Sequence, residues 1–291
     1  MAFLDKLKSM LQANKLDVSA RFELEKTAFT GTMSRFRVAK EIKTGKRMGI
    51  KFLDIEKTEA FEARFKGLKK PSEGEIGLQV KHPRVAETYE YGVTTNGEPY
   101  ILMQYIDGPG LSSLIQDEDP RLENHRIKMI RQMAEAIEAV HAAGFIHRDI
   151  CPRNFIADAD LENVTLIDFG LSVPDKPDFR QPGNRTGTPI YMAPEIVRRR
   201  HTDKRVDIFA LGVTAYRLLT FHHPWPGEDI TGKAALAHDT RQPVDILKHR
   251  PNLNKDLAEA IRACLKPDPT DRPESCDRLA KMIRKVERED T

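Results

Sequence analysis

The stretch His-Arg-Asp-Ile-Cys-Pro-Arg-Asn at residues 147–154 places a carboxylate, Asp149, five positions before an amide, Asn154. Downstream, the segment VTLIDFGL (164–171) adds a second carboxylate, Asp168. The short apolar runs after Asn154 and before Asp168 predict a β-hairpin that holds all three polar side chains at one end. Mg²⁺ prefers hard oxygen ligands and usually shares them with substrate phosphates. The stretch therefore predicts a magnesium and general-base cluster, with turn capping by Asp and Asn as the alternative.

Length and composition limit the classes of protein to consider. The chain has 291 residues, of which 40% are hydrophobic, so it can fold as a globular protein with a sizeable core. A formal net charge of only +3 gives no reason to expect a nucleic-acid partner. Cys151, Cys264 and Cys276 lack metal-ligand spacing and are odd in number, which favours a reducing, cytoplasmic location. No apolar run of about 18 residues and no secretion signal is present, so no transmembrane segment is expected.

The hydrophobic pattern changes character along the chain. The segments FELEKTAF, SRFRVAKEI and RMGIKFLD predict strands, and Gly45 and Gly97 lie where hairpin turns are needed. Beyond Gly108 the pattern becomes helical, as in HRIKMIRQMAEAIEAVHAAG (125–144), with Gly144 as the stop signal. This order predicts an α+β fold with two unequal lobes, a small β-rich one and a larger α-helical one, and a crevice at the joint.

The first residues form a separate predicted element. Residues 1–14 place Phe3, Leu4, Leu7 and Leu11 on one face of a helix. This helix either packs on the body of the protein or makes a peripheral contact with a membrane or a partner. The predicted organisation is an extension over residues 1–19 and one domain over 20–291, with lobes at 20–105 and 106–291.

The order of the motifs resembles a eukaryotic-type protein kinase domain over residues 21–282, with details similar to the soluble serine/threonine kinases of bacteria. The motifs that carry the resemblance are GIK (49–51), HP (82–83), LMQYIDG (102–108), HRDICPRN (147–154), DFG (168–170), GTPIYMAPE (187–195), DIFALGV (207–213) and DPTDRP (268–273). A single motif is weak evidence, whereas this many in the expected order make coincidence negligible.

The resemblance implies catalytic roles. Asp149 would orient and deprotonate the acceptor hydroxyl, and Asn154 and Asp168 would bind Mg²⁺. Lys51 would bind the α and β phosphates of ATP. Its carboxylate partner on the following helix is expected to be Glu73, with Glu75 as the alternative.

That helix contains Gly74 and Gly77 and follows Pro71, so it is predicted to be locally weak and open to regulation. Three further residues are expected to be structural. Glu195 and Arg272 resemble a buried ion pair, and Asp207 resembles a brace for the catalytic loop. Arg148 would tie that loop to the activation segment.

The resemblance also implies a nucleotide site. Met103 falls at the gatekeeper position, and the backbone carbonyl of Gln104 and the N–H of Ile106 would bind the adenine edge. Phe36, Gly49 and Ile156 would enclose its faces.

Two departures from the family pattern concern the phosphates. The glycine-rich loop reads FTGTMS (29–34), in which only Gly31 remains and Ser34 could donate its hydroxyl to a phosphate. Cys151 stands where serine/threonine kinases usually carry a lysine. Arg153 stands where many carry a glutamate, so a preference for arginine near the target residue is not expected.

Two functions follow. The first is an ATP- and Mg-dependent serine/threonine kinase whose partners are ATP and a protein substrate. The alternative is a pseudokinase that binds partners through the same surface, favoured by the degraded loop and Cys151. Thr186 is the one hydroxyl of the activation segment expected to act as a phosphorylation switch, with a weak effect.

Overall fold

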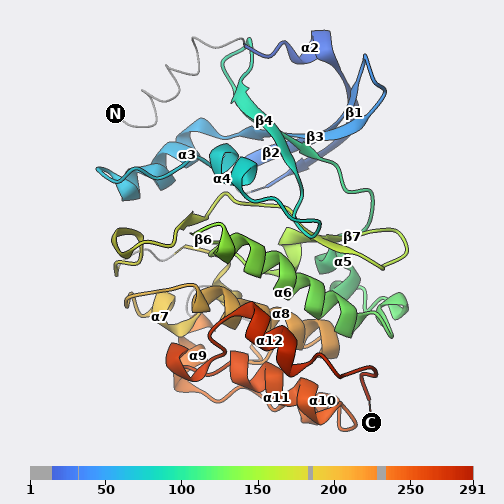
Figure 1. Cartoon of the computed structure of the whole chain (residues 1–291), viewed down its shortest axis with the longest axis vertical. Coiled ribbons are helices and arrows are strands. Elements are labelled where there is room, and N and C mark those ends of the chain that lie inside the picture. Colours follow the sequence, from blue (N-terminus) through green and yellow to red (C-terminus); the bar gives the residue numbers. More distant parts are fainter. Residues whose placement is uncertain (1–14, 32, 183–185, 228–233, 291) are drawn as a thin grey trace. The chain divides into compact units, whose positions relative to one another are not determined.

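The structure is a computed structural model that describes residues 15–31, 33–182, 186–227 and 234–290 (Figure 1). The helix predicted for residues 1–14 lies outside the described residues. The chain divides into two compact units. The first comprises the described residues up to Lys81 together with Ala86–Tyr105, and the second comprises His82–Val85 and the described residues from Ile106 onward.

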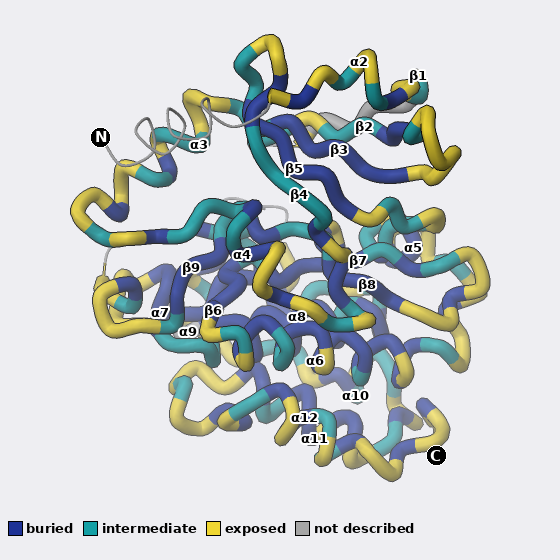
Figure 2. The backbone as a smooth tube through the Cα atoms, turned by 45° about the horizontal axis from the view of Figure 1, so that its top comes forward, coloured by how far each residue is buried: buried dark blue, intermediate teal, exposed yellow. Residues whose placement is uncertain are grey.

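The first unit is built on a five-stranded antiparallel sheet with the order β1-β2-β3-β5-β4. Its strands are β1 Phe22–Thr30, β2 Ser34–Glu41, β3 Arg47–Leu53, β4 Thr88–Val93 and β5 Pro99–Gln104. The predicted strands and both hairpins are therefore confirmed. Gly45 and Gly97 adopt φ values of 70° and 84°, a left-handed conformation that glycine reaches without strain. Figure 2 shows β3 and β5 as largely buried.

The described part of this unit contains the α-helices α2 Val18–Arg21, α3 Ile55–Glu62 and α4 Glu73–Gln79. Helix α4 packs on β4, and its two glycines make that approach possible. A Cβ on Gly74 would overlap the ring of Tyr91, and a Cβ on Gly77 would overlap the side chain of Thr88. A capping box joins Ser72 and Glu75 at the start of the helix. The glycines thus have a packing role, in addition to the low helix propensity noted from the sequence.

The second unit is mainly helical. Its principal elements are α5 Leu111–Gln116, α6 Arg126–Ala142, β6 Phe145–Ile146, β7 Phe155–Ala157, β8 Val164–Leu166, β9 Val173–Pro174, α7 Pro194–Val197, α8 Arg205–Thr220, α9 Ala237–Thr240, α10 Ile246–His249, α11 Lys255–Cys264 and α12 Cys276–Met282. Short 3₁₀ turns lie at Pro152–Asn154, Pro177–Phe179 and Pro189–Tyr191, among other places. With its β-rich and helical units, the protein confirms the predicted α+β class.

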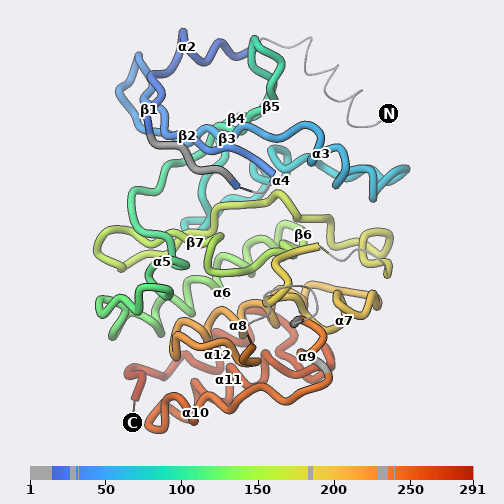
Figure 3. Tube along the Cα trace, turned by 180° about the vertical axis from the view of Figure 1, so that it is seen from behind, coloured from blue at the N-terminus to red at the C-terminus, as the bar shows by residue number. Residues whose placement is uncertain are grey.

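Helices α6 and α8 form the centre of the second unit. The residues that recur at helical spacing along α6 are buried, namely Ile127, Ile130, Met133, Ile137 and Val140, and the helix ends before Gly144, which has φ 84°. Helix α8 contacts α6 and α11, while α12 packs on α6. Near the C-terminus, Asp290 forms a bridge with Leu253, so this end lies beside α10 and α11 (Figure 3). Among the described helices, none is both long enough and apolar enough to cross a membrane.

Candidate active site

The backbone of the 147–154 loop is fixed by Asp207 on α8. Its carboxylate accepts hydrogen bonds from the N–H groups of His147 and Arg148, both at 2.8 Å. The same carboxylate lies 2.8 Å from Nε2 of His141 on α6. Burial alone would raise the pKa of Asp207, but the bond to His141 and the nearby histidines hold it below its ordinary value. Asp207 therefore braces the loop, as predicted.

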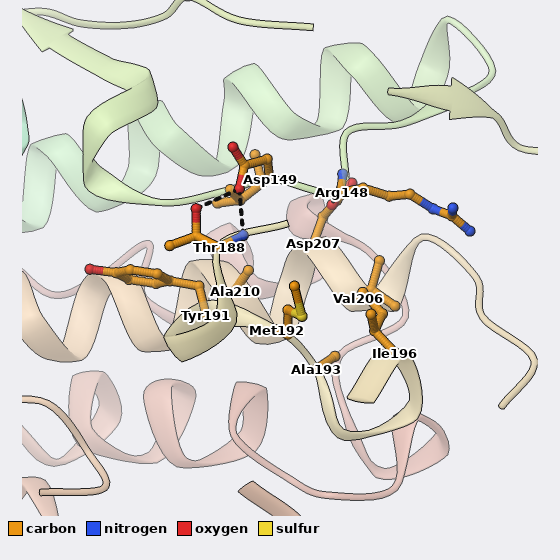
Figure 4. Close-up of a pocket in the computed structure, with 11 residues that line it drawn as sticks. Arg148, Asp149, Thr188, Tyr191, Met192, Ala193, Ile196, Val206, Asp207 and Ala210 are labelled. Carbon is orange, nitrogen blue, oxygen red and sulfur yellow. Dashed lines mark hydrogen bonds between the residues drawn. The ribbon is translucent and has the colours of Figure 1, made fainter. Parts of the chain in front are cut away.

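The Asp149 carboxylate lies at the centre of a hydrogen-bonded group (Figure 4). Its Oδ1 accepts from the N–H of Thr188 at 2.8 Å and from the Thr188 hydroxyl at 2.7 Å. The Asn154 amide donates to Asp149 Oδ2 at 3.1 Å and to the Asp149 carbonyl at 2.6 Å. One carboxylate oxygen is thus oriented by Thr188, which is distant in the sequence, and the other by Asn154, at the end of the same loop.

Asp168 is brought to Asn154 by the predicted hairpin. Strands β7 and β8 pair antiparallel, and the N–H of Ile167 donates to the Asn154 carbonyl at 3.0 Å. Asp168 follows directly and accepts from the N–H of Gly170 at 2.7 Å. Because Nδ2 of Asn154 donates to Asp149, the Asn154 side-chain atom that could bind a metal is its oxygen, Oδ1. An amide oxygen and a carboxylate are a donor set that fits Mg²⁺.

Arg153 reaches the residue that contacts Asp149. Its Nη2 donates to Thr188 Oγ1 at 2.8 Å, and the same hydroxyl lies 3.7 Å from Cys151 Sγ. The Cys151 side chain is buried, and burial together with the charge of Asp149 raises its pKa. Cys151 is therefore a neutral thiol near neutral pH. The positive charge beside Asp149 and Thr188 in the described part of this unit comes from Arg153.

In the first unit, Lys51 on β3 forms an ion pair with Glu73 on α4. The Nζ to Oε1 distance is 2.5 Å, and the side chains are only 8% and 14% exposed. Glu75 is instead engaged in the capping box, where it accepts from the backbone of Ser72 at 2.6 Å. The expected partner, Glu73, is thus confirmed over Glu75 in this structure.

The residues expected at the adenine faces in this unit are Phe36 and Gly49. Strands β2 and β3 bring them together, since a Cβ on Gly49 would lie 2.5 Å from two ring atoms of Phe36 and 3.3 Å from Met103 Cγ. The phenyl ring therefore occupies the space that a larger residue 49 would need. Gln104 ends β5, with its N–H bonded to the Glu87 carbonyl at 2.7 Å.

The remaining predicted nucleotide residues are placed as follows. Gly31 and Ser34 form the turn between β1 and β2, where the Gly31 N–H donates to the Ser34 carbonyl at 2.8 Å. In the second unit, Ile156 is half-buried on β7, and Ile106 is the first residue after Tyr105, where the division between units falls.

Comparison with known proteins places these motifs in one family. The protein kinase domain family matches residues 22–283. The chain belongs to the protein kinase domain family.

Among curated relatives, the serine/threonine-protein kinase pkn3 of Myxococcus xanthus is 27% identical over 94% of this chain and 51% of its own length. The serine/threonine-protein kinase PknB of Mycobacterium leprae is 28% identical, over 92% of this chain and 43% of its own length. A hormonally up-regulated neu tumor-associated kinase homolog of Xenopus laevis is 31% identical over 86% of this chain. The chain spans about half or less of the length of these relatives. None of these findings supports the pseudokinase alternative.

Two contacts anchor the segment downstream of DFG. Glu195 and Arg272 make a buried bidentate pair at 2.7 and 2.9 Å, as the resemblance implied. Arg148 points away from Asp149 (Figure 4) and donates to the Phe179 carbonyl at 2.9 Å, which ties the catalytic loop to the activation segment. Thr186 is buried, with a hydroxyl that has no partner among the described residues.

Two histidines that contact the backbone of the GTPIYMAPE segment were not predicted from the sequence. His223 Nε2 lies 2.7 Å from the Ile190 carbonyl, and His238 Nδ1 lies 2.7 Å from the Met192 carbonyl. They hold the backbone next to Thr188. Both lie beyond α8 and outside every motif, so only the tertiary structure connects them with the site.

Proposed function

We propose that this chain is an ATP- and Mg-dependent serine/threonine kinase that transfers the γ-phosphoryl group of ATP to a protein hydroxyl. The observation that carries the proposal is the pairing of Asp149 with the backbone and hydroxyl of Thr188. A carboxylate that accepts a hydrogen bond from a hydroxyl at 2.7 Å is oriented to accept the proton of an incoming serine or threonine.

The second unit would supply the acceptor and metal side of the reaction. Asp149 would take the proton of the acceptor hydroxyl once that hydroxyl replaces the Thr188 contact. Asn154 and Asp168 would hold Mg²⁺ through their side-chain oxygens, and the ion when bound would neutralise charge on the phosphates. Asp207 keeps the loop backbone in place while this happens.

The first unit would supply the phosphate and adenine contacts. Lys51, oriented by Glu73, would bind the α and β phosphates. The adenine would lie against Phe36 and Gly49, with Met103 beside them.

The other nucleotide contacts are proposed on the same basis. Gln104 and Ile106 would bind the adenine edge through their backbones, and Ile156 would cover its other face. Gly31 and Ser34 would approach the phosphates. The three buried, unpaired cysteines support a reducing location such as the cytoplasm.

Transfer of radiolabel from [γ-³²P]ATP to the chain itself or to a generic protein substrate tests the proposal. We expect labelled phosphoserine or phosphothreonine, and a loss of at least about 10³-fold in the Asp149→Asn variant. Asp160→Asn, an exposed position on the β7–β8 turn, is the matched control and should leave transfer unchanged.

A pseudokinase would bind nucleotide without transferring phosphate. If the wild-type signal equalled that of Asp149→Asn, while Mg-ATP still raised the melting temperature, the chain would bind nucleotide without catalysing transfer. That outcome would establish the pseudokinase alternative.

A further inference from the structure

A cluster of potential metal ligands lies between α6 and α12, away from Asn154 and Asp168. Glu138 and His141 are one turn apart on α6, and Cys276 is the first residue of α12. One carboxylate oxygen, one ring nitrogen and the sulfur all lie within 4.8 Å of one another. Cys276 is fully buried and His141 is 8% exposed, so these side chains do not form an ordinary solvated surface group.

The two nitrogens of His141 have different surroundings. Nε2 lies 2.8 Å from the Asp207 carboxylate. Nδ1 is buried and has no hydrogen-bond partner among the described residues. A buried ring nitrogen without a partner is costly and calls for a water molecule or an ion. The His141 nitrogen available to an ion is therefore Nδ1.

We propose that Glu138, His141 Nδ1 and Cys276 Sγ bind a divalent transition-metal ion, and that this ion is Zn²⁺. Carboxylate, imidazole and thiolate are all zinc ligands, and a water can complete a tetrahedral set. In a tetrahedral set with zinc bonds of about 2.0–2.3 Å, two ligand atoms lie roughly 3.5 Å apart. The ligand atoms here lie within 4.8 Å of one another, so side-chain rotations that bring them closer by up to about 1.3 Å complete the site.

Asp207 fits this site as the outer partner of the histidine. Metal-binding histidines usually donate their second N–H to a carboxylate, which fixes the ring and its tautomer. The contact between His141 and Asp207 has this arrangement, at 2.8 Å.

The site is coupled to the kinase loop through that carboxylate. Asp207 also accepts from the N–H groups of His147 and Arg148. An ion on Nδ1 makes Nε2–H a stronger donor to Asp207 and immobilises the ring. Metal binding thus stabilises the anchor of the catalytic loop. Burial, followed by the charge of Glu138, raises the pKa of Cys276 well above its ordinary value, so binding must release the thiol proton.

Zinc titration of the purified, chelator-treated full chain tests the site. We expect one Zn²⁺ per chain by equilibrium dialysis and a rise in melting temperature, because the ion binds only the folded state. Co²⁺ in place of Zn²⁺ should add thiolate-to-cobalt charge-transfer absorption in the near ultraviolet. Cys276→Ser should abolish that absorption and weaken zinc binding at least tenfold.

Two further variants keep the test decisive. Cys264→Ser is the matched control, since Cys264 is equally buried on the neighbouring helix α11 but is not part of the cluster. Glu138→Gln serves if Cys276→Ser fails to fold, and it should also weaken binding. Equal zinc affinity in Cys276→Ser, Glu138→Gln and wild type would overturn the proposal. So would the absence of both a thermal shift and cobalt absorption, which would leave a water molecule as the partner of Nδ1.

Discussion

Replacing Arg153 by alanine tests whether its guanidinium supports the proposed phosphoryl transfer, given the thiol at position 151. The substitution removes the guanidinium that donates to Thr188 Oγ1 at 2.8 Å. Thr188 in turn holds Asp149, so Arg153 is the positive group next to the proposed base. We expect the variant to fold normally, because residue 153 is exposed.

The expected loss follows from the strength and exposure of this contact. A preorganised electrostatic contact in a water-excluded site is worth about 10²–10³ in rate. Because Arg153 is exposed, solvent screens part of that effect, and we expect a loss of about tenfold in kcat, below that range and equal to about 1.4 kcal/mol.

A double-mutant cycle with Cys151→Lys distinguishes two roles for Arg153. The arginine either replaces the positive charge of a lysine at position 151 or only supports the structure of the loop. If Arg153 substitutes for a lysine at position 151, the Cys151→Lys background should reduce the effect of Arg153→Ala to less than about threefold, a coupling of at least roughly 0.7 kcal/mol. Arg121→Ala, at an exposed arginine that pairs with Asp119, controls for loss of surface charge.

Steady-state kinase assays at saturating ATP, with melting temperatures for each variant, provide the measurement. Equal losses from Arg153→Ala in both backgrounds would refute the idea that the two positions share one role. A loss below twofold in the native background would remove Arg153 from the mechanism altogether.

Three further predictions follow from the geometry. Gly49→Ala should cost about 1–3 kcal/mol in urea unfolding through overlap with the Phe36 ring, and Phe36→Val should recover most of that loss; an unaltered midpoint in Gly49→Ala would contradict this packing. Glu73→Gln should reduce kcat/KM for ATP, whereas Glu75→Ala, which removes the capping box, should instead cost roughly 0.5–1.5 kcal/mol of stability, and equal kinetic losses would count against the assignment. Burial lowers the pKa of His223 below its ordinary 6.5, so near and below pH 6.5 the unfolded chain binds more protons than the folded one, and the stability of the fold should fall as the pH drops through 6.5. In melting curves recorded at several pH values, His223→Gln should flatten this dependence. The same dependence in the variant and the wild type would contradict the prediction.

Much of the fold was predictable because local pattern and tertiary structure agree. Alternating residues predicted β2 and β3, helical spacing predicted α6, and Gly144 marked its end. The hairpin beyond Asn154 followed from two short apolar runs and is formed by β7 and β8. The family resemblance implied Glu73 as the Lys51 partner with Glu75 as the alternative, and the structure supplies the physical reason for the choice, because Glu75 is engaged in the capping box with Ser72.

Contacts between distant residues could not be predicted from local pattern. Arg153 meets Thr188 across 35 positions, and nothing in either segment indicates which way the arginine points. Gly74 carries a signal of low helix propensity, yet its role in packing depends on Tyr91, which lies on another element. Contacts of this kind depend on how elements pack, which propensity and periodicity do not encode.

The anchoring of the catalytic loop explains how the chain can carry a cysteine at position 151. The loop backbone is held at one end by Asp207, through the N–H groups of His147 and Arg148. At the other end, the Asn154 carbonyl is held by the β7–β8 hairpin. None of these backbone bonds involves the side chain at 151. The buried Cys151 Sγ lies 3.7 Å from the Thr188 hydroxyl that hydrogen-bonds to Asp149, so a change at this position reaches Asp149 through Thr188 and not through the loop backbone. A substitution at 151 should therefore alter the rate of the proposed phosphoryl transfer while the backbone anchors of the loop remain in place.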